Sequence, residues 1–213
     1  MIPVRDPHSG GVTMAIGDLI NDAVDLLGRV HEKTQSPEEQ ELLRAAADAL
    51  RFIWATGLTY EFVDYRESLD VESPAPVVAA FKTREEADSW LANHPKPPAM
   101  AYVLIAGEYH VVAYRRESDW RTFLPHPTLE FYIEEMTRDG LPPAVATFNT
   151  RDEADAWFDS QSEPPAQAVI QIGGEPYLAV YYRSIKHRAM FPFSVVEKLH
   201  ARRKGSAKEG PGA

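Results

Sequence analysis

The sequence contains an internal repeat with a fixed offset of 67 residues. Residues 83–90 read TREEADSW, and residues 150–157 read TRDEADAW. The same offset aligns residues 78–125 with residues 145–192 without a gap, and 20 of these 48 positions are identical. The repeat predicts two copies of one structural unit that pack together, because a unit this small buries little core alone.

Both copies show the same order of secondary-structure signals. A short β-prone run at residues 77–81, and at 144–148 in the second copy, predicts a buried strand. The TREE and TRDE sequences that follow are capping boxes, which predict the start of a helix. A Pro-Pro pair ends each helix, and two β-prone runs around a glycine turn then predict a hairpin. A second helix, near residues 128–138 and 194–203, completes a β-α-β-β-α unit.

The N-terminal third of the chain follows another pattern. Apolar residues at helical spacing predict one helix between Ile16 and Val30. A capping box at Ser36 predicts a second helix that continues to Trp54, so the two helices are expected to form a hairpin. Residues 58–66 alternate apolar and polar side chains, which predicts a strand.

These patterns predict an α+β protein with five segments. We expect a helical hairpin plus a strand in residues 15–75, followed by βαββα units in residues 76–142 and 143–203. The two units are expected to form a pseudo-symmetric pair, and one continuous sheet through both is one arrangement that the pattern allows. A flexible N-terminus (residues 1–14) and a disordered basic tail (residues 204–213) flank these segments.

Charge and composition argue against several classes of function. Acidic residues outnumber basic ones 32 to 22, and the formal net charge of −10 favours a basic protein partner over nucleic acid. The chain has no cysteine, which excludes disulfides and thiolate metal sites. Neither a signal-like start nor a long apolar run is present, so we expect a cytoplasmic protein without membrane contact.

No arrangement of residues in the sequence predicts an enzyme. The seven histidines are scattered without HxH or HExxH spacing, so neither a metal site nor a cofactor is expected. The G-x-S-x-G sequence of serine hydrolases and the glycine-rich sequences of nucleotide-binding loops do not occur. We therefore predict a protein without catalytic residues.

One repeated set of tyrosines and arginines is a candidate for binding a ligand or a partner. The set comprises Tyr114, Arg116, Arg121, Tyr181, Arg183 and Arg188. The tyrosines, Arg116 and Arg183 are expected on one face of a strand in each copy, and Arg121 and Arg188 in the loops that follow. Guanidinium groups bind carboxylates and phosphates through paired hydrogen bonds. Alternatively, each arginine pairs with acidic residues at the helix starts of its own unit, and retention in both copies favours this structural interpretation.

The two copies differ on one face of the hairpin that follows the Pro-Pro pair. Leu104 in the first copy corresponds to Gln171 in the second. This difference predicts that the face is covered in the first copy and wetter in the second. The cover can come from the N-terminal helices, from the other copy or from a partner, and we expect the N-terminal helices to provide it.

Three segments carry a resemblance to known proteins: TREEADSWLANHPKPP, VLIAGEYHVVAYRRE and LEFYIEEMTRDGLPPAVATFNTRDEADAWF. They resemble a bacterial group of tandem-repeat proteins, some of which carry the phage-associated label "head protein". The likeness extends over residues 15–203. The label implies a phage-derived gene, but it implies no activity and no site residue.

The sequence therefore favours a non-catalytic, acidic, protein-binding module, similar in kind to immunity proteins or inhibitors. Two alternatives stay open. One is a phage-derived virion or assembly component. The other is a sensor of small anionic ligands that uses the repeated arginines and tyrosines. The sequence does not indicate an oligomeric state.

Overall fold

The computed structural model describes residues 16–70 and 73–197, which confirm the α+β class. The chain divides into two compact units, Met1–Glu67 and Ser68–Ala213. The predicted flexible N-terminus and basic tail lie outside the described residues. Within the described part, six α-helices, one 3-10 helix and two four-stranded sheets are present. No helix in this part combines the length and the apolar character needed to cross a membrane.

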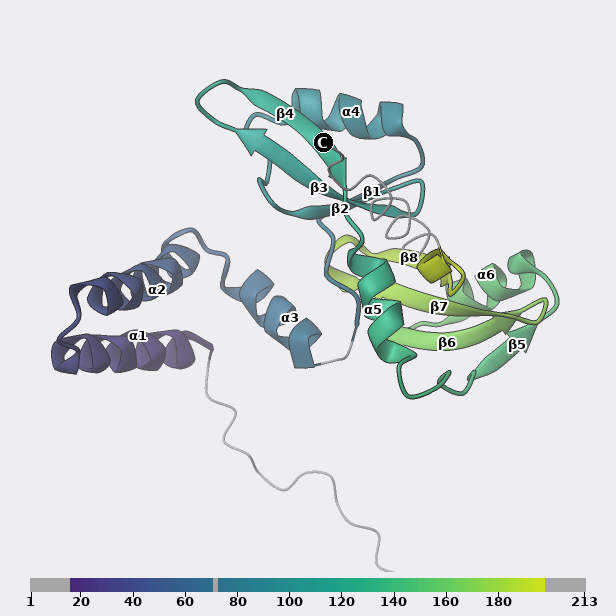
Figure 1. The fold of residues 1–213 in the computed structure, drawn as a ribbon, viewed down its shortest axis with the longest axis horizontal. Coiled ribbons are helices and arrows are strands. Elements are labelled where there is room, and N and C mark those ends of the chain that lie inside the picture. The colour runs from purple at the N-terminus through teal and green to yellow at the C-terminus, as the bar shows by residue number, and fades with distance from the viewer. Residues whose placement is uncertain (1–15, 71–72, 198–213) are drawn as a thin grey trace, which may run out of the picture. The chain divides into compact units, whose positions relative to one another are not determined.

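In the described residues the first unit contains two helices and most of a third (Figure 1). Helices α1 (Ile16–Lys33) and α2 (Pro37–Ala55) pack side by side, which confirms the predicted helical hairpin. The Ser36 hydroxyl accepts a hydrogen bond from the Glu39 amide and so begins α2, as the capping box predicts. Helix α3 (Thr59–Asp70) follows after a short turn.

The predicted strand at residues 58–66 is wrong, because the segment belongs to α3. Leu58, Phe62 and Tyr65 recur at helical spacing, so the apolar residues fit a helix as well as a strand. The amide of Phe62 donates to the carbonyl oxygen of Leu58 at 3.0 Å and so begins the helical ladder. A strand here would need a neighbour for its backbone groups, and the described residues of the first unit contain none.

The second unit contains two sheets with the same order of strands (Figure 1). The first sheet consists of β1 (Ala79–Phe81), β2 (Tyr102–Ile105), β3 (Glu108–Arg115) and β4 (Trp120–Pro125). The second consists of β5 (Ala146–Phe148), β6 (Gln167–Ile172), β7 (Glu175–Tyr182) and β8 (His187–Pro192). In each sheet the first pair of strands is parallel and the other two are antiparallel. All three ladders have the same register when 67 is added to each residue number.

A helix connects the parallel strands of each sheet. Helix α4 (Arg84–Asn93) lies between β1 and β2, and α6 (Arg151–Ser160) lies between β5 and β6. The Thr83 hydroxyl accepts a hydrogen bond from the Glu86 amide, and the Glu86 carboxylate accepts one from the Lys82 amide at 2.9 Å. The second copy repeats both bonds, so the capping boxes begin these helices where the sequence places them.

Each copy of the repeat contains one strand more than the predicted βαββα order. The additional strands are β4 and β8, which extend the hairpins of the two sheets. The two sheets are also separate, so the arrangement with one continuous sheet is wrong. Helix α5 (Thr128–Met136) is the predicted second helix of the first unit, and a 3-10 turn, η1 (Arg183–Ile185), joins β7 to β8. Of the helix expected near 194–203, residues 195–197 are helical and the rest lies outside the described residues.

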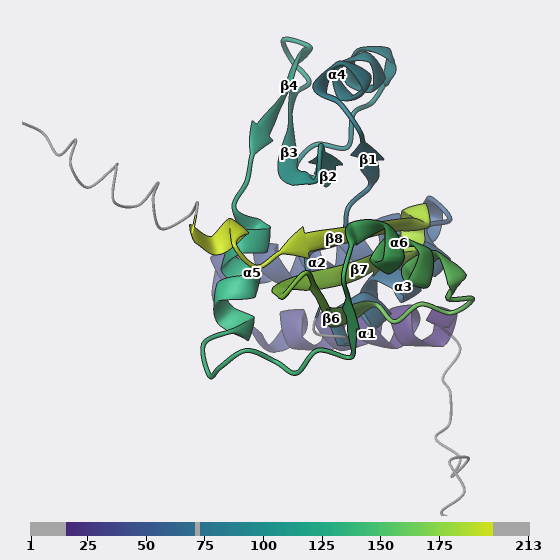
Figure 2. The same ribbon diagram turned by 90° about the vertical axis from the view of Figure 1, so that its right-hand side faces the viewer.

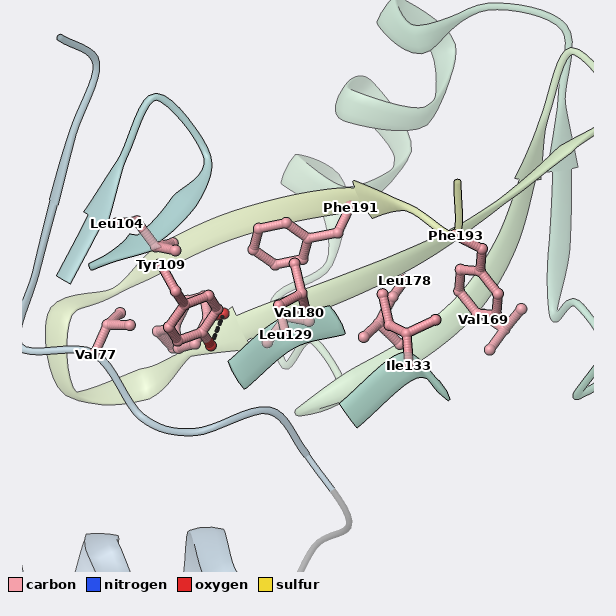
Figure 3. Packing of buried hydrophobic residues seen from close by; sticks show 11 residues of the cluster. Val77, Leu104, Tyr109, Leu129, Ile133, Val169, Leu178, Val180, Phe191 and Phe193 are labelled. Atoms are coloured by element: carbon pink, nitrogen blue, oxygen red, sulfur yellow. Dashed lines mark hydrogen bonds between the residues drawn. The ribbon is translucent and has the colours of Figure 1, made fainter. Parts of the chain in front are cut away.

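A single core joins the two sheets within the second unit (Figure 3). It contains Leu104 and Tyr109 of the first sheet, Leu129 and Ile133 of α5, and residues of the second sheet that include Leu178 and Phe191. Helix α5 lies against the second sheet, on the side away from α6 (Figure 2). Two smaller cores fill the space under α4 and under α6.

The cover of Leu104 differs from the prediction. Its side chain lies in the core that the first sheet shares with α5 and the second sheet, so the other copy provides the cover, whereas the sequence favoured the N-terminal helices. The prediction is wrong because the residues of the second sheet in this core are distant in sequence, and no sequence pattern shows which segment they pack against. Gln171, its counterpart, is half-buried.

Two tyrosine hydroxyls meet inside the shared core (Figure 3). The Oη atoms of Tyr109 and Tyr182 are 2.6 Å apart, and Tyr109 Oη lies 2.7 Å from the carbonyl oxygen of Ala75. A carbonyl oxygen only accepts, so Tyr109 donates to Ala75 and Tyr182 donates to Tyr109. Burial raises the pKa of both hydroxyls well above the ordinary value of 10.0, and both stay protonated.

The direction of these bonds predicts unequal effects of removing the two hydroxyls. Tyr109→Phe leaves the Ala75 carbonyl and the Tyr182 hydroxyl without a partner, so it should lower the free energy of unfolding by about 2 kcal/mol. Tyr182→Phe keeps the bond to Ala75 and should cost about 1 kcal/mol. Urea unfolding of both variants, with the exposed Tyr60→Phe as the control, measures the difference. A larger loss for Tyr182→Phe would contradict the assigned donors.

Candidate functional site

The structure pairs four of the six repeated residues across neighbouring strands. Tyr114 on β3 lies directly opposite Arg121 on β4, and Tyr181 on β7 lies opposite Arg188 on β8. The two arginines are therefore on strands, and their predicted position in loops is wrong. Each guanidinium carbon lies over its tyrosine ring, at 5.6 Å and 5.2 Å from the ring centres. The four residues thus form two separate pairs, one on each sheet.

Arg121 closes the C-terminal end of α4. Its Nη1 donates to the carbonyl oxygens of Leu91 and His94, both at 3.0 Å, and its Nη2 pairs with the Asp119 carboxylate. The last carbonyl groups of a helix have no partner within the helix and carry the negative end of its dipole. A guanidinium group at this position satisfies them and neutralises their partial charge.

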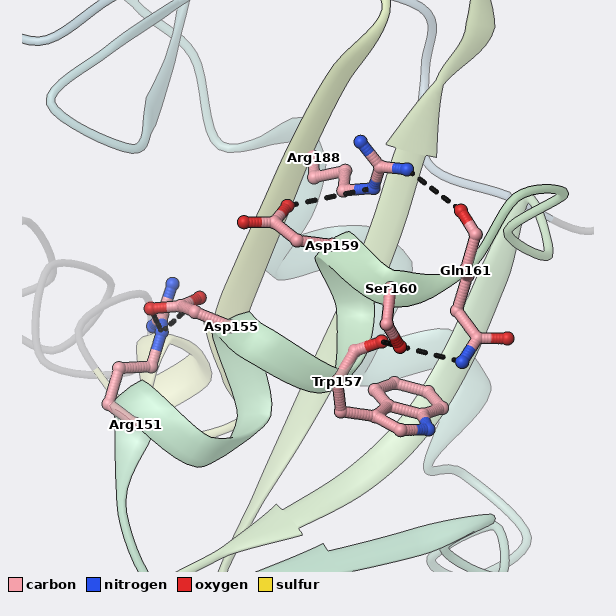
Figure 4. Close-up of polar contacts among 7 residues, drawn as sticks. All are labelled: Arg151, Asp155, Trp157, Asp159, Ser160, Gln161 and Arg188. Atoms are coloured by element: carbon pink, nitrogen blue, oxygen red, sulfur yellow. Dashed lines mark hydrogen bonds and ion pairs between the residues drawn. The ribbon is translucent and has the colours of Figure 1, made fainter.

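Arg188 has the same position at the end of α6 (Figure 4). Its Nη2 donates to the carbonyl oxygen of Gln161 at 3.0 Å, and its Nε lies 3.9 Å from the Asp159 carboxylate. Gln161 caps α6 as His94 caps α4. Both arginines therefore hold a helix end to the neighbouring sheet, and this role explains their occurrence in both copies.

The structural interpretation predicted that the repeated arginines pair with the acidic residues at the helix starts. The structure gives these acidic residues other partners. Asp88 pairs with Arg84 at 2.9 Å and Asp155 pairs with Arg151 at 3.0 Å, one turn earlier on the same helix (Figure 4). Such pairs one turn apart form on the surface of many helices. Arg121 and Arg188 bind helix ends instead, and their targets are main-chain carbonyls that no sequence pattern marks.

Arg116 and Arg183 lie at the surface, outside both pairs. Their predicted position on the strands is wrong, because β3 ends at Arg115 and β7 ends at Tyr182. Arg116 belongs to the turn between β3 and β4, and Arg183 belongs to η1. Arg183 and Tyr181 line a shallow hollow together with Glu163 and the Pro164–Pro165 pair. The carboxylate of Glu163 opposes the charge of Arg183, so this hollow is a poor fit for an anionic ligand.

The histidines do not form a metal centre in the part of the chain that the structure describes. No group of three or more histidine, aspartate or glutamate side chains is placed to hold a metal ion among these residues. Burial lowers the pKa of His187 on β8 below its ordinary value of 6.5, so its ring is neutral at neutral pH.

One face of the first sheet is buried in the shared core along β2 and β3 but half-exposed along β4, and no polar motif in the sequence marks this surface. Phe123 packs under α4, so Trp120, Thr122 and Leu124, which alternate with it along β4, point to the opposite side. We call these three residues the β4 strip. The side chains of Trp120 and Leu124 are each 50% exposed.

The second sheet differs at the corresponding place. Phe191 occupies the position of Leu124 there and is only 3% exposed, because it lies in the shared core. Helix α5 follows the first sheet in the chain but packs against the second. The β4 strip is therefore the half-exposed apolar surface that this asymmetric cover leaves on the first sheet.

No family model, curated protein or solved structure matches this chain. The resemblance to tandem-repeat proteins labelled "head protein" therefore stays a prediction.

The contacts of Arg121 predict a structural cost for its removal. Arg121→Ala leaves several carbonyl groups at the end of α4 without a charged donor and should lower the free energy of unfolding by about 2 kcal/mol. Arg138→Ala removes an exposed ion pair with Glu135 in the same unit and should cost less than about 0.5 kcal/mol. Urea unfolding compares the two variants. Equal losses would show that Arg121 does not hold the helix end.

Proposed function

We propose that this protein is a non-catalytic, cytoplasmic, protein-binding module in which a duplicated unit serves as a scaffold. The two copies form a pseudo-symmetric pair, and the first copy presents the binding surface. The equal strand order and the common register of the two sheets support the duplication. The resemblance found in the sequence assigns no activity that would compete with this function.

The roles of the repeated residues support a scaffold. Thr83 and Thr150 begin helices, and Arg121 and Arg188 hold the ends of the same helices. Trp90, another repeated residue, packs against Phe81 in the core under α4. Residues engaged in such contacts stabilise the fold and leave binding to surfaces where the two copies differ.

The half-exposed β4 strip is the single observation that carries the proposal. A tryptophan and a leucine on one half-exposed surface provide the apolar contact that protein interfaces commonly use. In the described residues β4 is also the last strand of its sheet, so one side of its backbone has no neighbouring strand. An extended segment of a partner can pair with such an edge while its side chains contact Trp120 and Leu124.

The charge of the chain indicates the kind of partner. The formal net charge of −10 attracts a protein with a basic surface and speeds their encounter at low salt. Immunity proteins and inhibitors are examples of small proteins that act in this way: they cover a surface of their partner and catalyse no reaction.

A quantitative pull-down from the native host tests the proposal. Trp120→Ser combined with Leu124→Ser should reduce the recovery of the specific partner at least about tenfold, because the apolar centre of the contact is lost. The control is Leu141→Ser, which changes a leucine of similar exposure outside the strip. Both variants should unfold at nearly the same urea concentration as the original protein. Recovery of no partner, or equal recovery by the double variant, would contradict the proposal.

A further inference from the structure

Helix α1 carries two adjacent apolar stripes, and only one of them is covered by α2. The inner stripe faces α2. It includes Ile20, which is buried, and Gly17, which lies against the side chain of Trp54 on α2. The outer stripe consists of Leu19, Ala23, Leu26 and Val30. Its members recur in steps of four, three and four residues, the spacing by which helices pack in bundles. Leu26 is 53% exposed.

Helix α2 repeats this arrangement. Its inner stripe includes Ala47, which is buried against α1. The outer stripe consists of Leu42, Ala46, Ala49 and Ile53, again in steps of four, three and four residues. Leu42 is 67% exposed, although a leucine at a regular bundle position normally has a partner.

The two outer stripes lie on the same side of the hairpin. In each helix the residues of the outer stripe precede those of the inner stripe by one position in the sequence. One position corresponds to a rotation of about 100° about the helix axis. The helices run in opposite directions, so equal rotations turn both stripes to one side. The other side carries polar residues such as Asn21, Arg44 and Arg51. We call the side with both outer stripes the apolar hairpin face.

The charges of the hairpin indicate what fits on this face. In α1, Asp18 and Asp22 lie in the first half, whereas the charges of Asp25, Arg29, Glu32 and Lys33 in the second half cancel. Helix α2 has the same polarity: its first half contains Glu38, Glu39, Glu41 and Arg44, and the charges of Asp48 and Arg51 in its second half cancel. A second hairpin placed antiparallel to the first puts each acidic half beside a half without net charge, which keeps the like charges apart.

The size of the face is sufficient for such a pairing. A helix of 18 residues is about 27 Å long, and two helices packed at roughly 10 Å make a face of roughly 500 Å². Two copies together therefore bury about 1,000 Å², which is the lower bound for a biological protein interface. Two layers of two helices also give a four-helix bundle, in which every apolar stripe is covered.

We propose that the apolar hairpin face binds the same face of a second copy of this chain and forms an antiparallel four-helix bundle. The chain is then a dimer through its first unit, and the β4 strip of each copy is left for another partner.

Light scattering during size-exclusion chromatography of the full chain tests the dimer. At about 100 μM, well above a micromolar Kd, the mass should be twice that of the 23.9 kDa chain. Leu26→Glu combined with Leu42→Glu should reduce it to one chain mass, because burying the new carboxylates is costly. Leu141→Glu, outside the face, should leave the dimer intact. A monomeric original protein, or a dimeric double variant, would overturn the proposal.

Cross-linking identifies the face that is used. The chain has no cysteine, so Leu26→Cys and Glu32→Cys each place a single thiol on α1. A bifunctional maleimide should join two copies of Leu26→Cys at least about fivefold more efficiently than two copies of Glu32→Cys, which lies on the polar side. Circular dichroism should show equal helix content for both variants. Equal yields of covalent dimer would place the contact elsewhere and refute the bundle.

Discussion

The packing of the first sheet against the second is the interaction on which the rest of the second unit depends. Neither sheet covers both of its faces with its own helix, since α4 and α6 each cover only one. The remaining faces meet in the shared core, where Leu104 and Tyr109 contact the second sheet. Helix α5 reinforces this union, because it leaves the first sheet in the chain and packs against the second (Figure 2). The bond between Tyr109 and Tyr182 satisfies both hydroxyls where water is excluded.

This union divides the molecule into parts that hold shape and parts that are available for binding. Several residues common to both copies begin helices, hold their ends or fill cores, as Thr83 and Arg121 illustrate. Half-exposed apolar residues lie on the β4 strip of the first sheet and on the apolar hairpin face of the first unit, among other places. The asymmetric cover by α5 thus leaves on the first sheet a half-exposed surface whose counterpart at Phe191 is buried.

The sequence predicted best what depends on neighbouring residues. The capping boxes located the starts of α2, α4 and α6, because their hydrogen bonds span only three or four positions. The segment 58–66 is predicted as a strand but is part of a helix. Its nine residues fit both the strand and the helix periodicity, and only the absence of a neighbouring strand in the described first unit distinguishes the two. Strand β4 forms a tight hairpin with β3 that begins at the Arg115–Trp120 pair, although the sequence pattern predicts a loop for this segment. The role of Arg121 depends on the carbonyl of Leu91, 30 positions earlier, and no pattern in the sequence marks this contact. The prediction of what covers Leu104 is wrong for the same reason.

Native-state hydrogen exchange of the full chain tests most directly whether the shared core makes the two sheets one cooperative unit. The backbone amides of Val112 on β3 and Ala179 on β7 are suitable reporters, because both residues are fully buried and occupy equivalent positions. The account predicts that both amides exchange through one common opening, with equal free energies that fall equally with denaturant. Exchange of Val112 at a clearly lower free energy, while Ala179 stays protected, would show that the first sheet unfolds alone and would contradict it.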